Sequence, residues 1–131
     1  MHNTRPIVQQ FLQALSQRDL DSITQLFAED VDWYIPGDSA KAKWLGRRAT
    51  RSEVADFYEL LWSSTEPVSA SIDAIFTEGV KAVISGEFVT KMLATGAIVE
   101  SLFFIQIAVE GDVIVKYRLL EDSHAVSLAL T

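Results

Sequence analysis

The sequence predicts an α+β domain in which three helices pack on a curved antiparallel sheet. Apolar residues recur at helical spacing through the first half of the chain. After Pro67 the pattern changes to runs of β-branched and aromatic residues, which are typical of strands. No repeat, low-complexity tract or linker interrupts the 131 residues, so we expect a single domain over residues 1–131.

Two helices and a strand are predicted at the start of the chain. Residues 5–17 place their apolar side chains on one helical face. Asp19 can cap a second, short helix, whose apolar stripe extends from Leu20 to Phe27. Val31–Ile35 then has the composition of a strand, and the turn pair Pro36-Gly37 should end it.

The clearest local signal lies in the middle of the chain. Residues 50–53 form a capping box, in which the Thr50 hydroxyl and the Glu53 carboxylate can each accept a free backbone N–H. A third helix with one apolar face should follow over residues 54–62. The segment before it, residues 38–48, is expected to be a loop that carries Trp44.

Four strands are predicted after Pro67. They are separated by the turn signals Glu78-Gly79, Ala94-Thr95-Gly96 and Glu110-Gly111-Asp112. The predicted strands are residues 69–76, 81–93, 98–110 and 113–122.

The predicted strand at residues 98–110 is apolar on both faces. One face presents Phe103, Ile105, Ile107 and Val109. The other presents Leu102, Phe104, Gln106 and Ala108. Three helices cover only one side of such a sheet, and a face that met water would be polar. We therefore expect a second copy of the chain to cover the open face in a homodimer, although a terminal segment or curvature of the sheet could do so within one chain.

Composition excludes several classes of function. The chain has no cysteine, which excludes disulfides, thiolate metal sites and a cysteine nucleophile. A net charge of −7 opposes binding to nucleic acid or to an anionic membrane. His2 and His124 lie at opposite ends, and no acidic cluster has the spacing of metal ligands, so no metal or other cofactor is expected. No run is long enough for a membrane span and no signal peptide is evident, which indicates a cytoplasmic domain.

Several short motifs, taken in order, resemble one family of proteins. The opening helices of the nuclear transport factor 2-like superfamily are similar to Val8-Gln9-Gln10-Phe11-Leu12, Arg18-Asp19-Leu20-Asp21 and Leu26-Phe27-Ala28-Glu29-Asp30-Val31. The SnoaL-like branch, which is close to ketosteroid isomerase, resembles the chain in Trp33-Tyr34-Ile35-Pro36-Gly37, Gly46-Arg47-Arg48, Val54-Ala55-Asp56-Phe57-Tyr58 and Gly111-Asp112-Val113-Ile114. The resemblance extends over nearly the whole chain and identifies it as a single SnoaL-like domain.

The resemblance implies a cystatin-like cone: a bent sheet and helices that enclose a deep apolar pocket, usually in a homodimer. Members include isomerases, polyketide cyclases, epoxide hydrolases and non-catalytic binding modules, so the fold alone does not determine the function. The function therefore depends on which residues of this chain occupy the catalytic positions of the family.

Two catalytic sets of the superfamily are absent. Where a ketosteroid isomerase has its carboxylate base, donor tyrosine and neutral acid, this chain has Ile35, Phe11 and about Gln106; only Tyr58 matches a supporting tyrosine. Because isoleucine cannot carry a proton, we reject that mechanism. The Asp–Arg–Asp set of limonene epoxide hydrolase corresponds to Glu87, Val89 and Leu119.

The SnoaL-type cyclases resemble this chain better, because their acid/base aspartate ends the last strand and matches Asp122. A carboxylate buried at a pocket could remove a proton next to a carbonyl. Strict alternation from Tyr117 and Leu119 would instead turn Glu121 inward; we keep both and favour Asp122. The structural alternative is that Asp122 pairs with Arg118 or caps the following turn.

Glu87 is the second candidate catalytic carboxyl, either lining the pocket or facing water beside Lys91. Aromatic residues that combine an apolar face with a polar atom suit a pocket for a ring compound. The residues expected to contact the ligand are Trp33, Ile35, Trp44, Tyr58, Trp62, Phe104, Gln106, Tyr117 and Leu119.

The sequence thus predicts a pocket protein for a small hydrophobic ligand. One hypothesis is a cofactor-free acid/base enzyme of the isomerase, cyclase or hydratase type, acting on a ring compound with a carbonyl. In it Asp122 is the base, and Tyr58 and Gln106 orient the substrate. The alternative is a non-catalytic module of the same fold that binds a small molecule or a protein.

Overall fold

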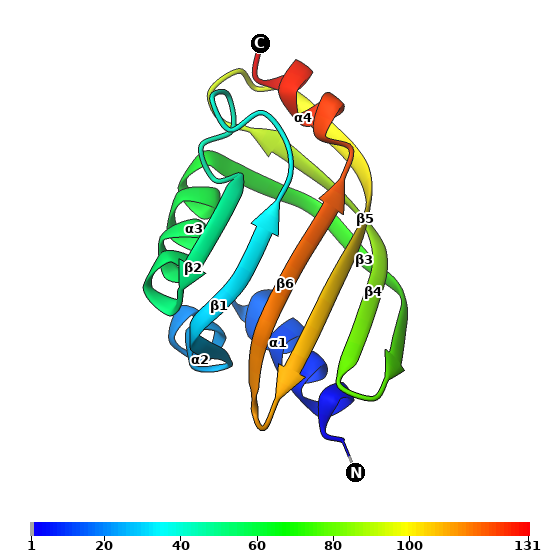
Figure 1. Cartoon of the computed structure of the whole chain (residues 1–131). Helices are drawn as coiled ribbons and strands as arrows, with labels where there is room; N and C mark the ends of the chain where they lie inside the picture. Colours follow the sequence, from blue (N-terminus) through cyan, green and yellow to red (C-terminus); the bar gives the residue numbers. More distant parts are fainter. Residues whose placement is uncertain (1) are drawn as a thin grey trace.

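The computed structural model describes residues 2–131 and shows helices packed on the concave side of one curved, open sheet (Figure 1). The helices are α1 (Thr4–Gln17), α2 (Leu20–Gln25), α3 (Arg51–Ser64) and α4 (Ser123–Ala129). The strands are β1 (Phe27–Ile35), β2 (Gly46–Thr50), β3 (Thr65–Glu78), β4 (Lys81–Met92), β5 (Ile98–Glu110) and β6 (Val113–Glu121). The predicted α+β class is confirmed. Within residues 2–131 no helix is long and apolar enough to cross a membrane.

The six strands form one mixed sheet in the order β2-β1-β6-β5-β4-β3. All neighbours are antiparallel except β1 and β6, which run parallel with Trp33 opposite Tyr117. The prediction of a purely antiparallel sheet is therefore wrong at one pair. Hydropathy patterns report which face of a strand is buried and carry no information about its neighbour, so they could not show that the last strand returns beside the first.

Two elements were missed by the sequence analysis. β2 overlaps the end of the segment 38–48 that was expected to be a loop, since an edge strand of five residues with two arginines shows no apolar alternation. α4 was not predicted beyond a turn that Asp122 could cap, and Asp122 provides its N-cap by accepting the Ala125 N–H at 2.9 Å. α3 begins where predicted: the Thr50 hydroxyl accepts the Glu53 N–H at 3.1 Å, and the Glu53 carboxylate accepts the Ala49 N–H at 3.0 Å.

β5 is apolar on both faces, as predicted. Its inner residues are buried, and cross-strand pairs such as Ile105 with Leu119 face the helices. On the outer face Leu102 and Phe104 are 68% and 51% exposed, and Leu120, opposite Phe104, is 53% exposed. No element of the described chain covers this outer face, which is turned toward the viewer in Figure 1.

An aromatic cluster fills the space between the helices and the start of the sheet. The rings of Trp33 and Tyr117 stack at 4.0 Å, with an angle of 13° between their planes. Phe57 meets the other edge of this stack at 4.9 Å, and Phe11 meets Tyr117 at 6.0 Å. These contacts are dry and closely packed. The cluster therefore makes this part of the cone solid.

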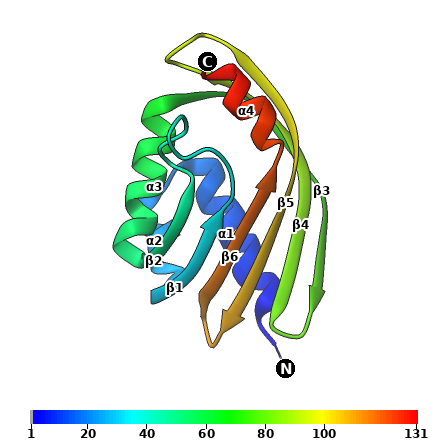
Figure 2. The same cartoon turned by 45° about the horizontal axis from the view of Figure 1, so that its top comes forward.

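Beyond the cluster, β3 and β4 curve around the helices, as Figure 2 shows, and the Thr4 hydroxyl at the start of α1 donates to the Gly79 carbonyl between these strands at 2.7 Å. Gly86 permits the close approach of strands there: a Cβ at this position would collide with the Ser71 carbonyl and lie 2.7 Å from the Phe103 ring. The bend leaves open space between β3, α1 and α3.

Candidate functional site

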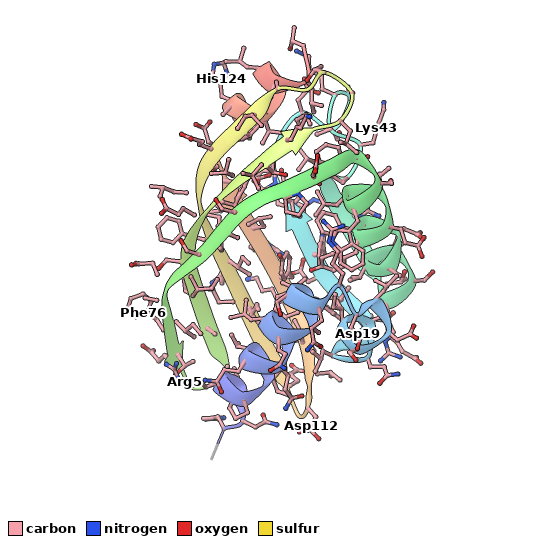
Figure 3. All side chains as sticks on the ribbon, turned by 180° about the vertical axis from the view of Figure 1, so that it is seen from behind. Arg5, Asp19, Lys43, Phe76, Asp112 and His124 are labelled. Carbon is pink, nitrogen blue, oxygen red and sulfur yellow. The ribbon has the colours of Figure 1, made fainter. Side chains whose placement is uncertain are left out.

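A cavity of about 540 Å³ lies between the concave face of the sheet, α1 and α3. Figure 3 shows the side of the molecule on which β3 crosses in front of this space. The volume is within the range of small-molecule sites, and the walls are mainly aliphatic and aromatic. Representative apolar wall residues are Leu12, Leu15, Leu61, Phe88, Met92 and Val126.

Six of the nine expected ligand contacts lie on this wall. They are Ile35, Trp44, Tyr58, Trp62, Tyr117 and Leu119. They come from β1, the loop after it, α3 and β6, so segments far apart in the sequence meet at one cavity.

The other three expected contacts lie elsewhere. Trp33 is 1% exposed, belongs to the aromatic cluster and does not line the cavity. Phe104 and Gln106 point to the outer face of the sheet, opposite Leu120 and Arg118. Their placement follows from strand alternation, since Phe103 and Ile105 occupy the inward positions of β5.

Neither of the two favoured carboxyls reaches the cavity. Glu87 is exposed on the outer face, opposite Leu102. Asp122 is also exposed: its carboxylate caps α4, while its N–H donates to the Ser101 hydroxyl at 2.8 Å. The structural alternative for Asp122, capping the next turn, is therefore the one that the structure contains.

Glu121 takes the inward position instead. The ladder between β5 and β6 continues to the pair Phe103 and Glu121, so alternation holds to the last residue of the strand. Glu121 lines the cavity together with Tyr117 and Leu119. In the sequence, the alternation of inward residues from Tyr117 and Leu119 indicated Glu121, whereas the match to a family position indicated Asp122. The structure follows the alternation.

The environment of Glu121 favours its protonated form. Burial raises the pKa of the Glu121 carboxyl from 4.5 to about 7, and repulsion from the Asp122 carboxylate acts in the same direction. No cation is among the groups that act on this carboxyl. Both protonation states are thus accessible near neutral pH, as a group that both accepts and donates protons requires.

Two tyrosines line the same cavity as this carboxyl. Burial raises the pKa of Tyr117 and of Tyr58 well above 10, so both remain neutral hydrogen-bond donors. The Glu121 carboxylate contributes to the shift at Tyr117, and the Tyr117 hydroxyl contributes to the shift at Tyr58.

The Tyr58 hydroxyl is buried beside the Tyr117 hydroxyl, and among residues 2–131 it makes no hydrogen bond of ordinary geometry. A buried hydroxyl without a partner costs about 1–3 kcal/mol. Because Tyr58 lines the cavity, a ligand oxygen is a suitable acceptor for it. In the described part of the chain no three His, Asp or Glu side chains are grouped as metal ligands. The site therefore offers one proton carrier and two neutral donors in an apolar enclosure.

Sequence reasoning also missed cavity residues on β3 and at the end of α1. Ser69, Ala70 and Ser71 line one side, although β3 was not singled out as a site element. Arg18 lies at the exposed end of the cavity. No pattern in the sequence distinguished these small or charged residues from ordinary surface residues.

The curved sheet, the helices on its concave side and the enclosed cavity define a cone-shaped α+β pocket protein. The SnoaL-like domain model matches residues 8–117, and the chain belongs to this family. No curated protein matches the chain significantly in sequence.

Solved structures agree with this fold at low sequence identity. A nuclear transport factor 2-like protein from Burkholderia pseudomallei is 20% identical, with a TM-score of 0.89 over 100% of this chain and 99% of its own. A provisionally assigned SnoaL-like polyketide cyclase from Mesorhizobium loti is 16% identical, with a TM-score of 0.75 over 90% and 98%. A provisionally assigned isomerase from Bacillus subtilis is 14% identical, with a TM-score of 0.80 over 96% and 91%.

The raised pKa of Glu121 predicts a specific dependence of stability on pH. Between pH 4.5 and about 7 the folded state retains a proton that the unfolded state has released. The free energy of unfolding should therefore fall as pH rises through this window, by at most about 3 kcal/mol, and then level off. Urea denaturation from pH 4.5 to 8 should show that Glu121→Gln lacks this fall.

Glu87→Gln, which removes an exposed carboxyl from the outer face, is the matched control and should keep the slope of the wild type. Parallel curves for the wild type and Glu121→Gln would mean that burial does not hold the proton on Glu121.

Proposed function

We propose that the cavity binds a small ring compound with a carbonyl group and that Glu121 moves a proton on it. The observation that carries this proposal is the position of Glu121: a carboxyl with a pKa of about 7 on an apolar wall, beside Tyr117. The same wall holds the unpartnered hydroxyl of Tyr58.

The chemistry needs only groups of the protein. The Glu121 carboxylate takes a proton from the carbon next to the ligand carbonyl, so that a C–H bond breaks and an O–H bond forms on Glu121. The negative charge moves to the carbonyl oxygen, which accepts a hydrogen bond from Tyr58. Glu121 then returns the proton, either to another carbon, which completes an isomerisation, or to an oxygen after the enolate has closed a ring.

The family and its structures support this class of reaction. Relatives of the same fold are provisionally assigned as a polyketide cyclase and as an isomerase. Both reactions can proceed by transfer of a proton next to a carbonyl, which is the chemistry that Glu121 and Tyr58 suit.

A second candidate is a binding module without catalysis. One observation favours it: among the described residues that line the cavity, Glu121 is the only one with a carboxyl group. The positions that match the base and the neutral acid of ketosteroid isomerase are Ile35 and Gln106, and neither side chain can replace a carboxylate. In this case Tyr58 and Glu121 would only hold the ligand by hydrogen bonds.

Proton exchange on a model ketone separates the two candidates. We expect the protein to accelerate deuterium incorporation next to the carbonyl of 2-tetralone in D₂O, followed by NMR. The rate should rise with pH to a plateau, with a midpoint near 7, because the carboxylate form is the base. Glu121→Gln should lower the plateau rate by about 10²–10⁴-fold, and Tyr58→Phe by a smaller factor.

Asp122→Asn is the matched control, because it changes the adjacent carboxyl and asparagine caps a helix as well as aspartate does. Its plateau rate should stay within about twofold of the wild type. Binding of 2-tetralone without accelerated exchange would favour the binding module, and equal losses in Glu121→Gln and Asp122→Asn would contradict the assignment of the base.

The outer face of the sheet bears on how this domain assembles, and we propose that a second copy of the chain covers it. Its centre consists of Leu102, Phe104 and Leu120, which are more than half exposed. An apolar centre can meet itself across a two-fold axis, which makes a homodimer the simplest partner.

Sedimentation or light scattering tests this assembly. The wild type should have about twice the 14.6 kDa mass of one chain, whereas Phe104→Asp should be monomeric because it places a charge in the centre of the contact. Leu128→Asp is the control, since Leu128 is 61% exposed on α4, and it should remain dimeric. A monomeric wild type at micromolar concentration would contradict the proposal.

A further inference from the structure

Arg18 holds a backbone conformation that glycine usually takes. It follows α1 with φ 50° and ψ 38°, and its N–H donates to the last carbonyls of the helix. Among the described residues it is the only one other than glycine with a positive φ. Glycine is the common residue at this place because a Cβ is unfavourable there, so the arginine occupies the position at a cost in stability.

The side chain of Arg18 offers a reason for this cost. Its guanidinium carbon lies 5.4 Å from the centre of the Trp62 ring, and both residues line the cavity. No carboxylate within residues 2–131 lies within ion-pair distance of it. The adjacent acid, Asp19, is engaged as the cap of α2, where it accepts hydrogen bonds from the N–H and hydroxyl of Ser22.

The cavity wall therefore carries one positive and one negative group, at separate places. Glu121 is at the end of β6, on the same wall as Tyr117, whereas Arg18 is exposed at the end of α1. Between them the Trp62 ring lies 5.4 Å from the Tyr58 ring, as measured between their centres. A ligand with an anionic end would be oriented in one direction, because its anion is attracted by Arg18 and repelled by the Glu121 carboxylate.

We propose that Arg18 recognises an anionic group on the ligand of this cavity. The ligand is then an apolar ring compound that bears a carboxylate or a similar oxyanion at the end remote from Glu121. This inference rests on the proposed function of the cavity as a ligand site. In a chain of net charge −7, an anion needs such a local cation in order to bind. The guanidinium carbon lies 5.4 Å from the centre of the Trp62 ring, and the planar fork of N–H donors can pair with both oxygens of a carboxylate.

A pair of fluorescent probes tests the inference. 8-Anilinonaphthalene-1-sulfonate and N-phenyl-1-naphthylamine share an apolar ring system, but only the first carries an anion. In the wild type, added salt should weaken binding of the sulfonate and leave the neutral probe unaffected. Arg18→Gly should lower affinity for the sulfonate about tenfold and leave the neutral probe unchanged.

Stability separates recognition from a structural role of the arginine. Because glycine relieves the strained backbone, Arg18→Gly should have an unchanged or higher Tm while it loses affinity for the sulfonate. Arg47→Leu is the matched control, since Arg47 stacks on the Tyr34 ring at 4.2 Å and does not line the cavity. It should bind both probes as the wild type does.

Outcomes for the cavity and for Arg18 remain distinguishable. Ala70→Trp places a large ring on the cavity wall and should abolish binding of both probes if they occupy the cavity. If Ala70→Trp abolishes binding of the neutral probe but Arg18→Gly leaves binding of the sulfonate intact, the inference is overturned while the proposed function stands. If Ala70→Trp has no effect on either probe, the cavity is not their site and the inference fails, whereas the proposed function is decided separately by the exchange of 2-tetralone. A lower Tm of Arg18→Gly with unchanged sulfonate affinity would show that Arg18 is structural.

Discussion

The stacking of Trp33 on Tyr117 is the contact on which the rest of the site depends. It joins β1 to β6 at the one parallel pair of the sheet, and Phe11, Phe27 and Phe57 surround it. Such a cluster excludes water and leaves no room for a ligand. It therefore determines where the solid part of the cone ends, and Tyr117 and Phe57 of this cluster also line the cavity beyond it.

The chemistry of the site follows from this boundary. Residues of β6 that point inward beyond Tyr117 enter the cavity, and the last of them is Glu121. Its carboxyl has lost much of its water without gaining a cation, and so it holds its proton up to about pH 7. Tyr58, on the facing helix, is buried by the same cluster, and its hydroxyl makes no hydrogen bond of ordinary geometry among residues 2–131. Packing, more than any motif, produces this functional arrangement.

Hydropathy periods in the sequence were sufficient for most of the fold. They predicted α1 to α3, the limits of β4 and β5 within one or two residues, and the two faces of β5, because burial selects side chains locally. Strand order and β2 depend on contacts between distant segments that no local pattern reports. At the site, alternation correctly indicated Glu121, whereas matching to a family position indicated Asp122, whose carboxylate caps α4. Arg18 could not be found from sequence because its distinguishing feature is a backbone angle.

Titration of Glu121 itself tests the central claim, that the cavity desolvates this carboxyl. With glutamate labelled at its side-chain carboxyl carbon, NMR spectra recorded from pH 3 to 9 should contain one resonance with a midpoint near 7, and this resonance should be missing in Glu121→Gln. If every glutamate carboxyl titrates near 4.5, Glu121 is solvated as an ordinary surface residue, and the account of the site is wrong.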